Sequence, residues 1–338
     1  MTLERWAIAL VVAALAATFL PARHAPEATR PGGGPRVGLV FDVGGRGDKS
    51  FNDAAYEGLS RARRELGVAT ELLEPTKSED REAAMRLFAT RGFDLVIAVG
   101  FLFSTDVDRV ARDFPNVRFA CIDYAPSDAG PPPNVAGLVF REEEGSYLVG
   151  AVAGMMTTTR HVGFVGGMQT PLVRKFEVGY EAGVHAVCSD CVVHVAYAGT
   201  TPDAFRDPAK GKALAIAEIA ADADILYHAS GATGHGVFEA AHETRRLAIG
   251  VDSDQFAEMP DAVLTSMVKR ADVAVFDTIH AVQEGRFHGG VHAFGVSDGA
   301  IDYVHEGPHA RLLTREVVAR VELLREAIVS GRVAVPSR

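Results

Sequence analysis

The chain contains few of the residues that characterise several large protein classes. Among its 338 residues are only three cysteines and one tryptophan. Three cysteines are too few for the disulfide framework on which small secreted scaffolds depend. Lysine and arginine number 34 against 44 aspartates and glutamates, a formal net charge of −10. Because this chain has no excess of positive charge to displace the counterions of nucleic-acid phosphates, we do not expect it to bind nucleic acid.

Long hydrophobic runs are also scarce, and the one exception lies near the N-terminus. The run from Trp6 to Leu20 follows an arginine and ends at a proline. It is shorter than the roughly 20 residues that span a bilayer, and its layout is typical of a secretory signal peptide. We expect residues 1–25 to be a signal peptide or an uncleaved signal anchor, and the proline- and glycine-rich residues 26–36 to be a linker. The protein is therefore expected to be exported, to the periplasm or the extracellular face of the cytoplasmic membrane.

Beyond this linker, short apolar runs alternate with segments of helical period. Residues 37–41 predict a buried strand, and the apolar positions Ala55, Leu59 and Ala62 recur along one helix face until Gly67, a residue that favours helix ends. Strands separated by helices of this length predict βαβ units and a parallel sheet. The other expected strands lie at 72–73, 94–99, 117–122, 161–165, 192–197, 225–228, 247–251 and 263–268. The other expected helices lie at 79–91, 104–113, 143–157, 172–186, 208–221, 234–244, 271–285 and 314–329.

A proline-rich turn at 126–133 divides this alternation into two sets of similar size. Each set has enough strands for one doubly wound α/β lobe with a parallel sheet. We expect an N-terminal lobe of residues 37–138 plus about 270–288, and a C-terminal lobe of residues 139–269 plus about 289–335. Two lobes joined by more than one crossing form a hinged pair with a cleft between them.

Two segments have the letters of catalytic or phosphate-binding motifs but not their context. The sequence HEGPH at 305–309 matches a zinc-protease motif, which works only on a helix, and Pro308 cannot continue a helix. The sequence GGRGDKS at 44–50 resembles a phosphate loop, but Asp48 puts a carboxylate where a polyphosphate would be bound. We therefore expect no metal, no cofactor and no enzymatic activity.

The cysteines allow three interpretations. Cys188 and Cys191 lie between a predicted helix and a predicted strand. In an exported protein a local disulfide is the leading interpretation. A pair of free or redox-active thiols is the second, and a zinc site is the weakest because a second pair of ligands is missing. Cys121 lies within an apolar strand and is expected in the core.

Candidate binding residues follow the predicted strands, because ligands of open α/β sheets bind beyond the carboxyl ends of the strands. These residues are Asp42, Phe51, Asn52, Asp123, Phe176, Phe205, Gly231, Asp252 and Lys269. Phe51 and Phe205 come from opposite lobes and are able to hold a flat ring between them. The carboxylates accept hydrogen bonds from vicinal hydroxyls, while Lys269 donates one and balances Asp252. Since the negative excess disfavours phosphate and carboxylate ligands, an uncharged heterocycle with a diol, that is, a nucleoside, fits best.

Each of these residues also has an ordinary structural interpretation. For Phe51 and Phe205 a place in the hydrophobic core is as good an interpretation as a ligand contact, and for Phe176 it is the better one. Aspartates that follow strands often cap helices, and Lys269 fits a solvated surface cation. The glycines of 231–236 fit either a close approach to a ligand or tight packing between a strand and a helix.

Taken in order, short motifs along the chain resemble the basic membrane protein family, the purine-nucleoside-receptor-like substrate-binding proteins of ABC transporters. The motifs are DKSFN at 48–52, EGSYLVG at 144–150, FEVGYEAG at 176–183, FRDPAKGKA at 205–213, GATGHGVF at 231–238, GVDSDQ at 250–255 and TSMVKR at 265–270. The resemblance implies a type I periplasmic-binding-protein fold whose lobes close on the ligand about a hinge.

The resemblance also implies roles for the candidate residues. It implies that Phe51 and Phe205 sandwich a base, and that Asn52 and Asp123 meet the base edge with Asp42 nearby. It implies that Gly231, Asp252 and Lys269 meet the ribose hydroxyls.

The implied function is that of a monomeric, exported binding protein that captures a nucleoside, a purine nucleoside in this family, and delivers it to an ABC permease. A receptor or sensor for a nucleoside or another aromatic ligand, without transport, uses the same cleft and is the first alternative, and a nucleoside hydrolase is the weaker one. Members of the family are usually lipoproteins, yet no cysteine near the N-terminus is available to carry a lipid. The membrane is therefore expected to be reached only through the N-terminal segment or the permease. The Cys188–Cys191 pair does not belong to the family pattern.

Overall fold

The computed structural model describes residues 34–42, 45–75, 80–307 and 310–338. The predicted signal peptide, most of the predicted linker and the last two residues of the HEGPH segment lie outside this range. None of the helices in the described ranges is both long and apolar enough to cross a membrane. Residues 35–338 form one structural unit, to which the following description applies.

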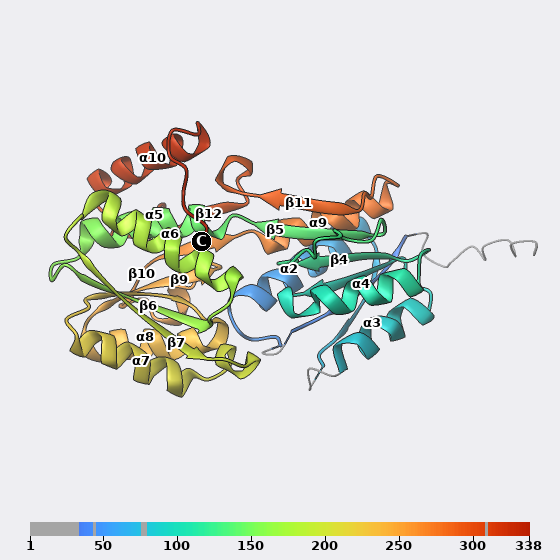
Figure 1. The fold of residues 1–338 in the computed structure, drawn as a ribbon, viewed down its shortest axis with the longest axis horizontal. Coiled ribbons are helices and arrows are strands. Elements are labelled where there is room, and N and C mark those ends of the chain that lie inside the picture. The colour runs from blue at the N-terminus through green and yellow to red at the C-terminus, as the bar shows by residue number, and fades with distance from the viewer. Residues whose placement is uncertain (1–33, 43–44, 76–79, 308–309) are drawn as a thin grey trace, which may run out of the picture. The chain divides into compact units, whose positions relative to one another are not determined.

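Two six-stranded sheets organise this unit (Figure 1). The first sheet has the order β11-β5-β4-β3-β1-β2, and its strands are all parallel. Its register places Val37 opposite both Thr70 and Leu95. The strands are β1 (Arg36–Val40), β2 (Ala69–Leu73), β3 (Leu95–Val99), β4 (Arg118–Ile122), β5 (Val135–Phe140) and β11 (Gly290–Phe294).

Helices cover both faces of the first sheet, and together they form what we call the first lobe. They are α2 (Phe51–Leu66), α3 (Asp80–Thr90), α4 (Ser104–Asp113) and α9 (Ala271–Gln283). Alternating strand residues explain the two layers, since Leu39 packs with α2 and α9 while Val40 packs with α3 and α4. As predicted, α2 ends before Gly67, whose φ of 66° is in the left-handed region.

The second sheet has the order β12-β10-β9-β8-β6-β7, and β12 alone among its described strands is antiparallel to its neighbour. Its strands are β6 (His161–Met168), β7 (Val192–Gly199), β8 (Ile225–Ala229), β9 (Leu247–Asp252), β10 (Val263–Lys269) and β12 (Ile301–Tyr303). Its helices are α5 (Glu142–Met156), α6 (Pro171–Val187), α7 (Pro208–Ala220), α8 (Gly234–Thr244) and α10 (Arg315–Val329). The pair α5 and α6 covers one face and the pair α7 and α8 covers the other. This is the second lobe.

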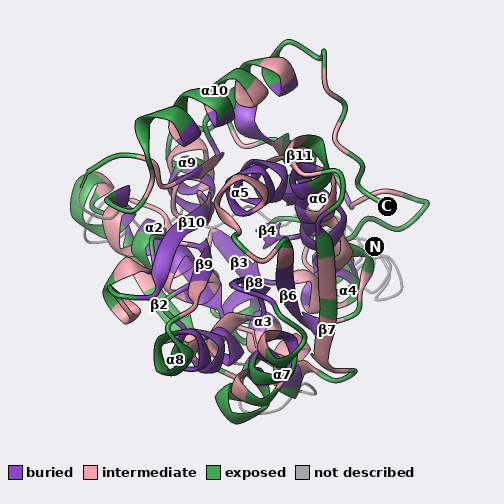
Figure 2. Ribbon diagram, turned by 90° about the vertical axis from the view of Figure 1, so that its left-hand side faces the viewer, coloured by how far each residue is buried: buried purple, intermediate pink, exposed green. Residues whose placement is uncertain are grey.

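Burial follows the layers of both lobes. Figure 2 shows buried residues along the central strands and exposed residues on the outer sides of α7, α8 and α10. Cys121 on β4 is fully buried and unpaired, which confirms its predicted place in the core.

Three strands, β5, β11 and β12, were not predicted from the sequence. Strand β5 follows the proline-rich turn directly, and β11 and β12 are short strands at sheet edges, where the alternation of apolar residues is weak. The sequence analysis placed residues 290–294 in the C-terminal lobe, yet they are hydrogen bonded to β5 in the first sheet. Pairing between distant segments decides to which sheet a strand belongs, and the periodicity along one segment does not encode this pairing. The remaining lobe bounds stay a prediction.

The described chain crosses between the sheets at three places. These are the passages from β5 to α5, from β10 to α9, and from β11 to β12. The first two matter for function, because Glu142 begins α5 and Lys269 ends β10. Both crossings therefore run beside the ends of strands at which the candidate residues lie.

Candidate functional site

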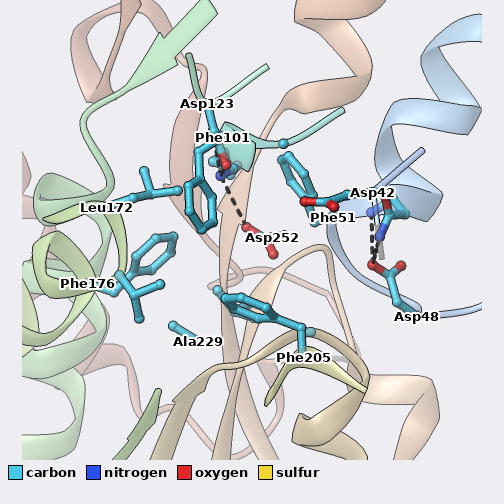
Figure 3. A pocket seen from close by; sticks show the side chains of 16 residues that line it. Asp42, Asp48, Phe51, Phe101, Asp123, Leu172, Phe176, Phe205, Ala229 and Asp252 are labelled. Atoms are coloured by element: carbon cyan, nitrogen blue, oxygen red, sulfur yellow. Dashed lines mark hydrogen bonds and ion pairs between the residues drawn. The ribbon is translucent and has the colours of Figure 1, made fainter. Parts of the chain in front are cut away.

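A pocket lies where the carboxyl ends of strands from both lobes meet (Figure 3). It is lined by Asp42, Asp48, Phe51, Asn52, Gly100, Phe101, Asp123, Leu172, Val173, Phe176, Phe205, Ala229, Gly231, Val251, Asp252 and Lys269. We call it the interlobe pocket. The empty space among these side chains, including its opening to solvent, is about 680 Å³. Every candidate residue named from the sequence lines this pocket.

Seven lining residues were missed by sequence reasoning. Gly100 and Phe101 follow β3, so the rule that located Asp42 and Asp123 would have found them as well. Leu172 and Val173 carry no such signal, because apolar residues in the first turn of α6 are indistinguishable from core residues. Figure 3 shows Leu172 and Phe176 across the pocket from Phe51.

Lys269 lies at the centre of the charged groups. It is buried, which contradicts the alternative of a solvated surface cation. Its Nζ is 2.8 and 3.0 Å from the two oxygens of Asp123, and 3.8 Å from Oδ1 of Asp252. The sequence predicted that Lys269 balances Asp252, but its nearest partner is Asp123. The ion pair therefore joins β10 of the second lobe to the end of β4 in the first.

Burial and mutual repulsion set the protonation of these groups. Burial raises the pKa of Asp123 to about 6; Glu142 and Asp252 add to this rise, and Lys269 opposes it. Burial likewise raises the pKa of Asp252. For Lys269 burial favours the neutral amine, yet the surrounding carboxylates outweigh burial and raise its pKa. Lys269 is thus an ammonium at neutral pH within a surplus of carboxylates.

Glu142 is a second partner of Lys269 that the sequence analysis did not identify. Its side chain is fully buried at the start of α5, with Oε1 3.4 Å from Nζ of Lys269. Its other oxygen contacts Nζ of Lys175 on α6, and Lys175 also donates to the carbonyl oxygen of Phe140. Glu142 does not line the interlobe pocket, so it acts on the pocket indirectly, by holding Lys269 and by its charge near Asp123 and Asp252.

Asp48 explains the segment that resembled a phosphate loop. Its carboxylate accepts hydrogen bonds from the backbone amides of Ser50, Asn52 and Asp53 at 3.0, 2.9 and 3.1 Å. These amides belong to the N-terminus of α2, so the carboxylate caps the helix. Asp48 also accepts from Nδ2 of Asn52 at 3.0 Å. The oxygen of the same amide, Oδ1, is buried and has no hydrogen-bond partner among the described residues.

Aromatic rings form the walls of the interlobe pocket. Phe51, Phe101, Phe176 and Phe205 all line it, and Figure 3 shows Phe51 and Phe205 on different sides of the space. Phe176 is buried and also faces the pocket, so its core and lining interpretations are both correct. The ring of Phe205 rests against Gly167, where an added Cβ would lie 2.2 Å from the ring. A glycine is therefore required to seat Phe205.

Two lining carboxylates share an uncommon backbone conformation. Asp123 has a φ of 59° and Asp252 a φ of 65°. Aspartate tolerates this left-handed region better than most residues, but at some cost in energy. Such strain is concentrated at functional sites, and here it turns each side chain at a strand end toward Lys269.

The cysteine pair lies away from the pocket. Cys188 and Cys191 form a disulfide across the turn between α6 and β7, as the leading interpretation predicted. Neither residue lines the interlobe pocket. In the described ranges of the chain, no group of three or more histidine, cysteine, aspartate or glutamate residues is placed to hold a metal ion.

Comparison with known proteins identifies the chain. The model of the family described as "ABC transporter substrate-binding protein PnrA-like" (Bmp) matches residues 36–338. The chain belongs to the Bmp family. The ABC transporter nucleoside-binding protein BmpA of Lactococcus lactis is 29% identical over 325 residues, which cover 90% of this chain and 89% of that protein. An uncharacterised lipoprotein of Pyrococcus horikoshii is 34% identical over 306 residues, covering 88% of this chain and 75% of the other.

A solved structure confirms the fold of this Bmp protein. The crystal structure of an ABC transporter solute-binding protein from Aeropyrum pernix is 30% identical in sequence and has a TM-score of 0.81. The match covers 90% of this chain and 94% of the other. The predicted family and the predicted fold of two parallel-sheet α/β lobes are both confirmed. Bmp proteins are substrate-binding proteins of ABC transporters, and their lipoprotein members fit a place outside the cytoplasm.

Proposed function

We propose that this Bmp protein captures a nucleoside, in the first place a purine nucleoside, in the interlobe pocket and delivers it to an ABC permease. One observation carries the proposal: aromatic rings from both lobes line the same pocket as a buried acid and a buried amine. Phe51 and Phe205 supply the rings, and Asp252 and Lys269 supply the polar pair. The nucleoside-binding relative from Lactococcus lactis supports this ligand class.

The aromatic walls favour a flat ring. Stacked aromatic pairs contribute about 0.5–1.5 kcal/mol each beyond the burial of apolar area. Phe51 is held beside Lys269, whose Nζ lies 4.6 Å from the ring centroid. This contact restricts the position of the ring, which lowers the entropy lost on binding.

The polar groups favour a neutral ligand rich in hydrogen-bond donors. Among the described residues that line the pocket, the polar side-chain atoms are oxygens, apart from Nδ2 of Asn52 and Nζ of Lys269. The Asn52 nitrogen is engaged by Asp48, so the amide presents its oxygen to a base. Asp252 keeps a buried oxygen, Oδ1, without a hydrogen-bond partner among the described residues. Ribose hydroxyls and the N–H groups of a base satisfy such acceptors, whereas a phosphate would be repelled.

Calorimetry tests the ligand. The protein is unfolded, freed of bound molecules by dialysis and refolded, then titrated with inosine, guanosine, adenosine, uridine, hypoxanthine, ribose and inosine monophosphate. We expect the purine nucleosides to bind more tightly than hypoxanthine or ribose, because each of these lacks one half of the contacts. Inosine monophosphate should not bind measurably. Preference for the phosphorylated compound, or for ribose alone, would contradict the proposal.

Delivery to a permease is tested separately in the source organism. Deletion of the gene should reduce uptake of radiolabelled inosine, and reintroduction of the intact gene should restore it. Unchanged uptake together with an altered cellular response to inosine would favour the sensor alternative.

The hydrolase alternative predicts free hypoxanthine and ribose after incubation with inosine, and we expect neither. Light scattering at the calorimetric concentrations should give the mass of a monomer, since one chain supplies every lining residue of the pocket.

A further inference from the structure

Ser50 reaches from the first lobe to the second beside the interlobe pocket. It directly precedes α2, is completely buried and lies far in sequence from its partners. Its Oγ is 2.8 Å from Oδ2 of Asp252 and 3.2 Å from the carbonyl oxygen of Val251. The single hydroxyl proton of Ser50 is therefore held between two acceptors at the end of β9.

A second hydrogen bond crosses at the same place in the opposite direction. The hydroxyl of Ser253 donates to the carbonyl oxygen of Ser50 at 3.3 Å. Ser50 thus makes three hydrogen bonds to residues 251–253 of the other lobe. Of the three, only the bond from the Ser50 hydroxyl to Oδ2 involves the Asp252 carboxylate.

The two oxygens of Asp252 have different partners. Oδ2 accepts from Ser50, while Oδ1 is buried, lies 3.8 Å from Nζ of Lys269 and has no hydrogen-bond partner among the described residues. A carboxylate is planar, so fixing one oxygen sets the direction of the other. The bond from Ser50 therefore determines how Asp252 presents Oδ1 to the pocket that it lines.

The loop that carries Ser50 is fastened to the first lobe. Asp48 accepts from the amide of Ser50, and Asp53 on α2 accepts from the amides of Gly47 and Lys49 at 2.9 and 3.1 Å. Ser50 consequently moves with α2, whereas Asp252 moves with the second sheet. The hydrogen bond between Ser50 and Asp252 therefore exists only while the two lobes are together.

We propose that Ser50 is a positioning residue that orients Asp252 across the two lobes, so that the ribose hydroxyls of a nucleoside are bound fully only in the closed form. This inference rests on the proposed function. Separation of the lobes removes the Ser50 hydroxyl from Oδ2, and the carboxylate then rotates freely in water. Closure restores the hydrogen bond and directs Oδ1 toward the ligand. Recognition of the sugar and closure of the lobes are thereby coupled through one side chain.

Dissociation kinetics of two ligands test the proposal. Inosine and 2′,3′-dideoxyinosine share the base but differ in the hydroxyls that Asp252 would bind. In Ser50→Ala we expect inosine to dissociate about tenfold faster or more, as for a lost hydrogen bond to a charged group, with little change in association. Dideoxyinosine should dissociate less than threefold faster. Ser50→Thr keeps the hydroxyl and should retain the slow dissociation of inosine.

Ser253→Ala is the matched control, since it removes a contact between the lobes without touching Asp252. This variant should accelerate the dissociation of both ligands by the same factor. If Ser50→Ala accelerates the dissociation of both ligands equally, or does not accelerate the dissociation of inosine, the positioning role is overturned. If the wild-type protein binds neither ligand, the proposed function fails first and this inference fails with it. Thermal unfolding of each variant shows that it is folded.

Discussion

Lys269 and Asp123 form a buried ion pair that joins the two lobes, with both carboxylate oxygens within 3.0 Å of the ammonium. Asp252 and Glu142 surround the same ammonium at 3.8 and 3.4 Å. A lone buried charge is costly, so each member of this group depends on the others. The ion pair is therefore both a support of the fold and one wall of the interlobe pocket.

Replacement of this ammonium should destabilise the protein strongly. In Lys269→Met three buried carboxylates lose their shared cation, and we expect a loss of about 3–5 kcal/mol in the free energy of unfolding. Urea denaturation at pH 7.5 measures it. Lys210→Met, which removes an exposed lysine on α7, is the control and should change stability by less than about 0.5 kcal/mol. Similar values for the two variants would show that Lys269 is not needed to balance the cluster.

The seat of Phe205 provides a test of the aromatic wall. Gly167→Ala would place a Cβ 2.2 Å from the Phe205 ring and displace it from the pocket. We expect inosine affinity to fall by about fivefold, since the lost stacking contributes of the order of 1 kcal/mol. At Gly199 the nearest atom to an added Cβ is 3.3 Å away, so Gly199→Ala should bind inosine almost normally. Calorimetry compares the inosine affinities of the two variants, and equal affinities would place Phe205 outside the site.

Glu218 gives the protein a pH-dependent weakness away from the pocket. Burial raises the pKa of this carboxyl to about 9, and neither oxygen has a hydrogen-bond partner among the described residues. Because the folded-state pKa lies above the unfolded value of about 4.3, its contribution to stability is present at acidic pH and is lost progressively as pH rises toward 9.

Glu218→Met should therefore raise the free energy of unfolding by about 1–3 kcal/mol at pH 7.5, because an unsatisfied buried polar group is removed. The gain should shrink as the pH is lowered to 4.5. Urea denaturation across this range measures it, with Glu326→Met on the exposed side of α10 as control. A gain that does not depend on pH would contradict a raised pKa.

The disulfide should matter for stability and not for binding. It closes a turn with a sequence separation of 3, for which chain entropy predicts a stabilisation of about 2 kcal/mol. Replacement of both Cys188 and Cys191 by serine should lower the free energy of unfolding by this amount and leave inosine affinity within twofold. A large loss of affinity would show that the turn between α6 and β7 acts on the pocket.

The amino-acid sequence by itself determined the alternation of strands and helices, because strands buried on both faces are continuous apolar runs. It also determined which side chains follow the strand ends, and all of the candidate residues chosen in that way line one pocket. The motif at 48–52 and its companions were sufficient to place the chain in its family.

Only the tertiary structure decided how these residues combine. It paired Lys269 with Asp123 more closely than with Asp252, added Glu142 as a further partner of Lys269 and brought Ser50 to Asp252. The contacts Lys269–Asp123 and Ser50–Asp252 join segments of two lobes that are more than a hundred residues apart in sequence. Periodicity describes which face of one segment is buried. The strength of an ion pair or hydrogen bond depends instead on differences of a few tenths of an ångström in the distance between atoms of two segments. The places at which the chain crosses between the lobes set these distances.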